Sequence, residues 1–195
     1  MATRITIARY KGPIGEMLLA SVEGKLVHLD FEGNNDRLRT IQNRRFRQID
    51  WQESGTAPTP VIRWLDAYFE GELRPLPMAE IEMIGTDFQK QVWRALIAIP
   101  SGESRSYGAL AVELGNPQAV RAVGRANALN PVSIIVPCHR VIGSDGKLTG
   151  YAGGLARKHW LLEHEARMAL CASAAPNFAT TIGKAGLDLG DLGSL

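Results

Sequence analysis

Residues 4–31 alternate between apolar and polar side chains in three short runs. The runs are separated by Gly12-Pro13-Ile14-Gly15 and by Glu23-Gly24-Lys25, which are typical turn sequences. A period of two between such turns predicts strands, because successive side chains of a strand point to opposite faces. We therefore expect the chain to open with three consecutive strands.

The rest of the first 85 residues has a mixed pattern. Residues 60–71 carry apolar side chains at helical spacing and end at Gly71, a residue that commonly stops a helix. Around this helix the sequence predicts a basic surface helix at 34–46, a loop at 51–59 and a last strand at 79–84. We place a domain boundary near residue 85 and expect a small α/β domain before it, without site chemistry of its own.

After this boundary the pattern becomes mainly helical. Thr86 and Gln89 have the spacing of a capping box, and a helical stripe of apolar residues follows. A last helix is predicted from residue 155 to about 169, with Leu155 on its buried side. From Cys171 onward small residues and glycine dominate, which is typical of a mobile tail.

Two short helices in this region are joined by a tight turn. The first helix is predicted at residues 107–114 and stops at Gly115. The second helix is capped by Asn116, has Pro117 in its first turn and runs to about residue 128. This is the pattern of a helix-turn-helix, although many helical hairpins bind nothing.

The composition of the second helix suits a close approach to DNA. It combines small residues with two arginines four positions apart on one face, although two solvated surface arginines would explain the pair equally well. The residues we expect at DNA are Arg121, Ala122, Gly124, Arg125, Ala126 and Asn127.

A thiol, an imidazole and a guanidinium follow one another at Cys138, His139 and Arg140, between branched apolar residues. We expect residues 132–136 to be a buried strand that brings this triplet to a cavity wall, because buried polar groups need partners. A cysteine becomes a strong nucleophile as a thiolate, and a nearby base usually generates it. Adjacency alone does not prove contact between Cys138 and His139, since neighbours on an extended chain face opposite ways.

Charge and composition narrow the class of protein. Residues 86–168 carry ten Lys or Arg against six Asp or Glu, a net +4 that weakly favours an anionic partner such as nucleic acid. We find no apolar run of bilayer length, no secretory leader and no zinc-type Cys/His spacing. The sequence therefore predicts a cytoplasmic protein without metal or other cofactor, in which Cys138 and Cys171 are free thiols.

In this order, the motifs closely resemble the O6-alkylguanine-DNA alkyltransferases, also called methylated-DNA–protein-cysteine methyltransferases. The motifs that carry the resemblance are Arg121-Ala-Val-Gly, Asn130-Pro131, Pro137-Cys-His-Arg-Val141 and Gly150-Tyr-Ala-Gly-Gly154. The resemblance is strong over residues 86–167 and looser before them. It implies a ribonuclease-H-like α/β domain at 1–85, a mainly α domain with a winged helix-turn-helix at 86–170, and a flexible tail at 171–195.

The resemblance also implies roles for individual residues. Cys138 accepts the alkyl group from O6-alkylguanine, and from O4-alkylthymine, in one irreversible step. His139 takes the thiol proton through a water, Glu165 orients His139, Tyr107 donates to the purine N3, and Asn130 is a hinge. Arg140 is then a structural ion-pair partner. The residues implied for the substrate pocket are Val141, Tyr151, Ala152 and Gly153.

The partner implied is duplex DNA, bound through its minor groove by a monomer, with Arg121 filling the gap left by a flipped-out nucleotide. Cooperative binding along DNA is left open. The alternatives are a lesion-binding relative that flips the base without chemistry, and a cysteine hydrolase. The presence of Cys138 argues against the first, because such relatives lack this cysteine, and no sequence feature suggests an oxyanion hole for the second.

Overall fold

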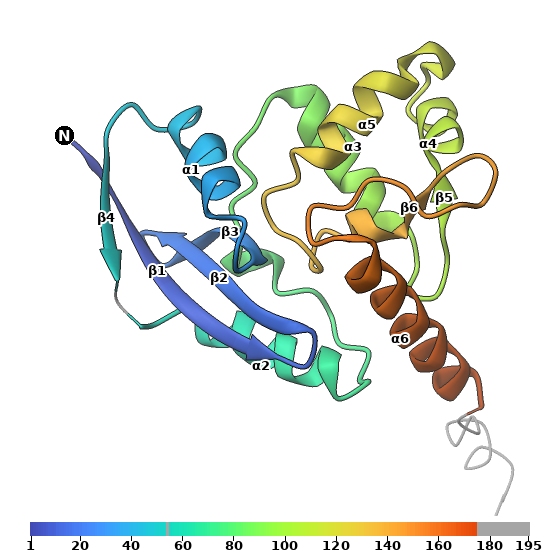
Figure 1. Cartoon of the computed structure of the whole chain (residues 1–195), viewed down its shortest axis with the longest axis horizontal. Coiled ribbons are helices and arrows are strands. Elements are labelled where there is room, and N and C mark those ends of the chain that lie inside the picture. Colours follow the sequence, from blue (N-terminus) through green and yellow to red (C-terminus); the bar gives the residue numbers. More distant parts are fainter. Residues whose placement is uncertain (54, 175–195) are drawn as a thin grey trace, which may run out of the picture.

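The computed structural model describes residues 1–53 and 55–174. It has an N-terminal domain built on a four-stranded sheet, which packs beside a mainly helical C-terminal domain (Figure 1). The tail predicted at 171–195 lies outside the described residues from 175 onward, whereas residues 171–174 are helical. Within the described part, no helix is long and apolar enough to cross a membrane.

The sheet consists of β1 (Thr3–Gly12), β2 (Gly15–Val22), β3 (Lys25–Phe31) and β4 (Ile49–Glu53), in the order β3-β2-β1-β4. The first three strands are antiparallel neighbours, which confirms the three strands predicted at the start of the chain. The predicted loop at 51–59 is wrong for its first residues, because β4 pairs with β1 in parallel. Strand β4 has only 5 residues and pairs only with the first half of β1. A strand this short shows no clear alternating pattern in the sequence.

Helices cover both faces of the sheet. Met17 and Leu19 of β2 pack in the same apolar cluster as α2 (Thr59–Phe69), whereas Leu18 and Ala20 pack with Leu38 of α1 (Asn35–Asn43). This explains why β2 is an unbroken apolar run rather than an alternating one, since a strand with both faces covered needs no polar side. Both predicted helices are confirmed.

The segment that leaves the sheet is less regular than predicted. In place of a strand at 79–84, it forms a 3-10 helix, η1 (Met78–Glu80), and touches the sheet through one bridge between Leu26 and Ile81. Pro75 and Pro77 precede it, and proline cannot donate to a strand ladder.

The C-terminal domain opens with α3 (Asp87–Ala98), whose capping box between Thr86 and Gln89 is present as predicted. The helix-turn-helix follows as α4 (Tyr107–Glu113), a 3-10 turn η2 (Pro117–Ala119) and α5 (Val120–Ala128). The Asn116 side chain makes no capping hydrogen bond, so the predicted cap is wrong. The 3-10 turn separates Asn116 from α5, which leaves its side chain out of reach of that helix start.

The remaining elements are a small parallel pair of strands, β5 (Arg105–Ser106) and β6 (Val141–Ile142), and α6 (Leu155–Ala174). Helix α6 extends to Ala174, beyond the predicted end at about 169. Leu155 is 50% exposed, contrary to prediction, because the buried face of α6 is formed instead by Lys158, Leu161, His164, Glu165 and Met168.

The two domains meet at the free edge of β3. The backbone N–H of Leu29 donates to Pro131 (2.9 Å), and Ser133 donates back to Leu29 (2.8 Å). The segment that leads to Cys138 therefore continues the N-terminal sheet for one bridge and covers its edge.

Candidate active site

Cys138 follows a series of tight turns rather than the predicted buried strand at 132–136. Only Val132 forms a bridge, and Ile134 has a positive φ of 71°. A β-branched residue in this left-handed region is strained and persists only where its surroundings hold it. Cys138 itself begins a one-turn 3-10 helix, η3 (Cys138–Arg140), so Cys138 and His139 are not in extended alternation.

Asn130 holds these turns in place. Its side-chain N–H donates to the carbonyl of Val136 (2.8 Å), and its Oδ1 accepts from the N–H of Val132 (3.0 Å). Asn130 is fully buried directly after the end of α5. It therefore ties the recognition helix of the helix-turn-helix to the segment that carries Cys138, as expected for a hinge.

The Cys138 thiol lies on the wall of a cavity of about 350 Å³ and is only 5% exposed. Burial raises the pKa of the thiol, and a hydrogen bond from Asn130 and the positive charges of Arg37 and Lys158 offset this only in part. The thiol is thus protonated at neutral pH and needs a base before it can attack.

His139, the next residue along the chain, is held by Glu165. Its Nε2 lies 2.8 Å from Oε1 of Glu165, with both side chains fully buried. Burial lowers the pKa of His139, more than the carboxylate of Glu165 raises it, so the imidazole is neutral at pH 7. A neutral imidazole that donates from Nε2 keeps its lone pair on Nδ1, and Nδ1 has no hydrogen-bond partner among the described residues.

Glu165 is held from three directions. Arg140 donates through Nε to Oε2 (2.7 Å) and through Nη2 to Oε1 (2.9 Å), and the Tyr68 hydroxyl donates to Oε1 (2.9 Å). Burial alone would raise the pKa of Glu165, but the hydrogen bonds from the neutral His139 and from Arg140, together with the positive charge of Arg140, outweigh it and hold the pKa well below its usual range. Arg140 is thus the structural ion-pair partner that was expected.

Two tyrosines, Tyr107 and Tyr151, line the cavity. Burial raises the pKa of Tyr107, which keeps its phenol protonated and able to donate. The residues that line the cavity are Arg37, Tyr107, Gly124, Asn127, Ala128, Cys138, Gly150, Tyr151 and Ala152. Two residues predicted for the pocket, Val141 and Gly153, are buried but are not among its lining residues.

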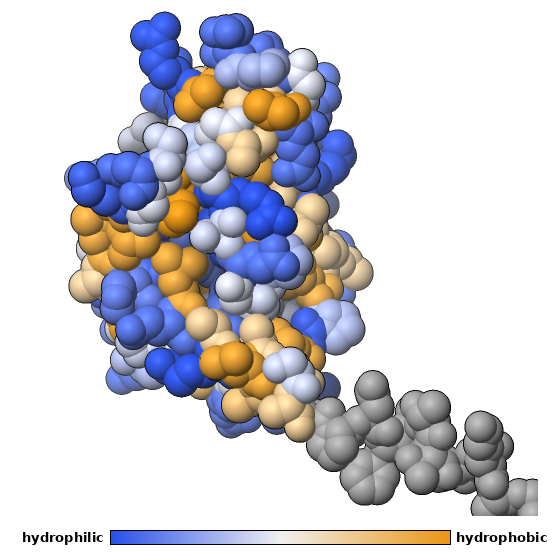
Figure 2. All heavy atoms as spheres, turned by 90° about the vertical axis from the view of Figure 1, so that its right-hand side faces the viewer, coloured by the Kyte–Doolittle hydropathy of each residue, from blue (hydrophilic) through white to orange (hydrophobic). Residues whose placement is uncertain are grey.

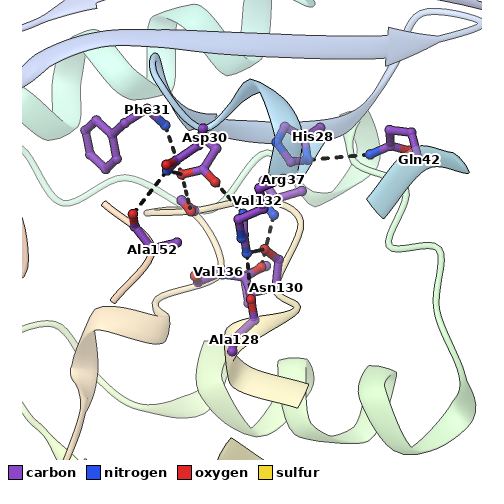
Figure 3. A network of polar contacts seen from close by, with 12 residues as sticks. His28, Asp30, Phe31, Arg37, Gln42, Ala128, Asn130, Val132, Val136 and Ala152 are labelled. Atoms are coloured by element: carbon purple, nitrogen blue, oxygen red, sulfur yellow. Dashed lines mark hydrogen bonds and ion pairs between the residues drawn. The ribbon is translucent and has the colours of Figure 1, made fainter. Parts of the chain in front are cut away.

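The N-terminal domain contributes to this site, so the prediction that it has no site chemistry is wrong. Arg37 of α1 forms an ion pair with Asp30 of β3 and donates to the carbonyls of Ala128 (2.8 Å) and Asn130 (2.7 Å), as Figure 3 shows. Asn34 donates to the carbonyl of Ala152 in the loop on the opposite wall (3.1 Å). The available sequence signal was Asp30, an acid between Leu29 and Phe31 in a largely apolar strand.

Lys158 of α6 is a second residue that influences the Cys138 site and that the sequence analysis did not predict. Its Nζ donates to the carbonyls of Val141 and Thr149, and burial lowers its pKa to about 8. The available signal was its spacing of seven residues from Glu165, which places both on the same face of α6.

The exposed ridge of α5 differs slightly from the predicted DNA-binding set. Arg121, Ala122 and Arg125 are at least partly exposed, as expected. Ala126 faces the core instead, where its carbonyl accepts from Nε1 of Trp93 (3.0 Å). Asn127 is likewise buried, at the wall of the Cys138 cavity.

Gly124 is half-buried on the same helix. A Cβ at this position would lie 3.8 Å from the Tyr107 ring, which is an ordinary contact. Internal packing therefore does not require glycine here. Figure 2 shows the face of the C-terminal domain, where hydrophilic and apolar side chains are interspersed.

No group of three or more His, Cys, Asp or Glu side chains in residues 1–53 and 55–174 is placed to hold a metal ion.

Comparisons with known proteins agree with this geometry. Residues 87–167 match the model of the 6-O-methylguanine DNA methyltransferase DNA-binding domain, and residues 5–82 match that of its ribonuclease-like domain. A methylated-DNA–protein-cysteine methyltransferase from Methanosarcina barkeri is 49% identical over 155 residues, which cover 80% of this chain and 93% of that protein. The corresponding protein from Salmonella typhimurium is 44% identical and covers 81% of this chain and 94% of its own length.

Solved structures show the same arrangement. The crystal structure of Mycobacterium tuberculosis OGT in complex with DNA has a TM-score of 0.73 at 44% identity, covering 84% of this chain and 94% of that one. The methyltransferase from Pyrococcus kodakaraensis has a TM-score of 0.61 at 26% identity, covering 83% of this chain and 98% of its own. With both of its domains matched, this chain belongs to the family of O6-methylguanine DNA methyltransferases.

Proposed function

We propose that this chain reverses DNA alkylation by moving the alkyl group of O6-alkylguanine, and of O4-alkylthymine, to Sγ of Cys138. The observation that carries the proposal is a protonated thiol on a cavity wall, next to a neutral imidazole that Glu165 fixes with its Nδ1 unpaired. The relatives are named methylated-DNA–protein-cysteine methyltransferases, and their name describes this reaction.

The step is a displacement at the alkyl carbon. Nδ1 of His139 takes the thiol proton, directly or through a water, and Glu165 stabilises the imidazolium that forms. The thiolate attacks the alkyl carbon, the C–O6 bond breaks, and its electron pair stays on the purine. Tyr107 donates a hydrogen bond to the purine N3, so charge on the leaving guanine is reduced as it develops. The proton that left Cys138 ends on the guanine.

The product explains why one protein acts once. A thioether carries no proton that His139 could remove and is not hydrolysed under mild conditions. The reaction needs no cofactor, and it needs a reduced thiol, so we propose that the chain works in the reducing cytoplasm. One guanine restored per protein molecule, with a plateau at one equivalent, is the expected result; continued turnover would contradict the proposal.

We further propose that the chain binds DNA as a monomer, with α5 in the minor groove. The exposed small residues of α5 permit a close approach, and its C-terminal end leads through Asn130 to Cys138. Because the thiol is almost fully buried at the cavity wall, a stacked base cannot reach it, and the damaged nucleotide must be flipped out. Arg121 is exposed on α5, and we propose that its side chain occupies the gap in the stack.

Arg121→Ala should separate DNA handling from chemistry. We expect the second-order rate with an O6-methylguanine duplex to fall at least about tenfold, because unstacking costs a few kcal/mol that the inserted side chain partly offsets. The rate with free O6-benzylguanine should change less than about twofold. Arg167→Ala, an exposed arginine on α6, is the control and should alter neither rate. Equal losses on duplex and free base would refute the flipping role.

A further inference from the structure

A second hollow lies beside α5, on the side away from Cys138. It consists of two adjoining cavities of about 440 and 250 Å³ that share Arg44, Thr86, Gln89 and Leu129 as lining residues. Its walls come from the end of α1, the start of α3 and α5, which lie along the upper side of the molecule in Figure 1. The hollow therefore spans both domains at the helix-turn-helix.

The two hollows lie on opposite sides of the recognition helix. The Cys138 cavity is lined by Gly124, Asn127 and Ala128. The second hollow is lined by Ala122, Arg125 and Ala126. At 100° per residue, the centres of these two sets are separated by roughly 150° around the helix axis, with Arg121 on the ridge between them.

The second hollow is basic and has no counter-charge. Arginines are its only charged lining residues: Arg44 and Arg45 from the segment that follows α1, and Arg125 from α5. In the part of the chain that the structure describes, none of the three is in an ion pair with a carboxylate, whereas Arg9 and Arg74 are.

Among the described residues Arg45 is in no ion pair with a carboxylate, and its Nη1 donates only a long hydrogen bond (3.5 Å) to the carbonyl of Val27. Its guanidinium lies 5.9 Å from the Trp93 ring centroid, and burial, with the nearby charge of Arg37, lowers its pKa to about 10. A partly buried guanidinium gains most from an anion, and its planar fork fits the geometry of a phosphate.

We propose that this hollow binds backbone phosphates of the DNA strand opposite the damaged nucleotide, through Arg44 and Arg125 with Arg45 behind them. The inference rests on the proposed docking of α5. A helix in the minor groove, which is about 6 Å wide, has one sugar-phosphate backbone on each side. The strand with the flipped nucleotide must pass the Cys138 cavity, so the opposite strand passes the second hollow. In this arrangement the N-terminal domain contacts DNA directly, through Arg44 and Arg45.

Binding to a short undamaged duplex that accommodates one protein tests this site. Removing one arginine that neutralises a phosphate should reduce the slope of log Kd against log salt by about 0.9, so Arg44→Ala should lower the slope by about one. Arg44→Lys keeps a positive charge and should recover most of that decrease. Arg63→Ala, an exposed arginine on α2, is the matched control and should leave the slope unchanged.

Neutral methylphosphonates placed one at a time along each strand of a short duplex that carries one O6-methylguanine identify the strand. Wild-type protein should lose affinity several-fold at one or two positions on the opposite strand, and Arg44→Ala should lose nothing more at those positions. Coupling on the damaged strand, or no coupling on either strand, overturns the inference. An effect of Arg44→Ala seen only on long duplexes that hold several copies also overturns it, because the hollow would then serve a contact between copies.

Alkyl transfer from free O6-benzylguanine, measured on the same proteins, keeps the two proposals apart. If Cys138 is alkylated but the salt slope and the methylphosphonate pattern do not respond to Arg44, this inference fails and the proposed function stands. If wild-type protein takes no alkyl group, the proposed function fails. The effect of each methylphosphonate on binding affinity still shows which phosphates the protein contacts, so the inference about the hollow is tested separately.

Discussion

Cys138→Ser should abolish alkyl transfer and leave DNA binding within about twofold of wild type. A serine hydroxyl is a far weaker nucleophile, and loss of a catalytic nucleophile costs on the order of 10⁴- to 10⁶-fold in rate. The substitution is nearly isosteric, and the buried site offers the new hydroxyl the Asn130 side chain that now contacts the thiol. Single-turnover reaction with an O6-methylguanine duplex and binding to the same duplex measure the two effects.

The second cysteine supplies the control for this substitution. Cys171 is exposed on α6, so Cys171→Ser should react at the wild-type rate. Residual transfer by Cys138→Ser would mean that another group accepts the alkyl group. Wild-type protein that binds the lesion but never restores guanine would instead indicate a lesion-binding protein without chemistry.

Glu165→Gln should impair both the reaction and the stability of the fold. The amide cannot accept from Tyr68, His139 and Arg140 together, and it leaves the Arg140 guanidinium without a counter-charge. Breaking a buried ion pair on one side typically costs about 3 kcal/mol or more of unfolding free energy. With a neutral amide in place of the carboxylate, the imidazolium that forms when His139 takes the thiol proton also loses its counter-charge, and alkyl transfer should slow by about 10²- to 10⁴-fold.

The pH dependence of stability gives an independent reading of Glu165. Its pKa in the folded protein lies below its unfolded value of about 4.3, so its contribution is complete above that value. That contribution is lost as the pH falls through the folded pKa. The gap in unfolding free energy between wild type and Glu165→Gln should therefore be widest near pH 7 and shrink below about pH 4. A gap that is constant with pH, or a transfer rate equal to wild type, would contradict the role assigned to Glu165.

The sequence predicted most of the C-terminal domain because its signals are local. The Thr86 capping box and the helical stripes depend on residues within one or two turns of each other, and the motif around Cys138 is contiguous. Local patterns of this kind survive folding unless packing overrides them. The predicted strand before Cys138 failed because its branched apolar residues are buried in turns, which Asn130 holds by hydrogen bonds that no periodicity reveals.

What the sequence did not predict depends on contacts between distant segments. Arg37 lies 93 residues from Asn130, whose carbonyl it contacts, and Tyr68 lies 97 residues from Glu165. An arginine in a basic helix and a tyrosine on a helical face each fit an ordinary surface or core role. The packing of β3 against the segment at 131–133 helps to bring the N-terminal domain to the active site. The same packing creates the basic hollow between α1, α3 and α5.

The central claim is that Cys138 keeps the alkyl group. Protein incubated with excess O6-methylguanine duplex, then digested and weighed, tests it directly. The peptide that contains Cys138 should gain about 14 Da, one methyl group in place of a proton, in one copy per protein, while the peptide that contains Cys171 keeps its mass. Restored guanine with an unchanged Cys138 peptide, or the added mass on another residue, would contradict the account.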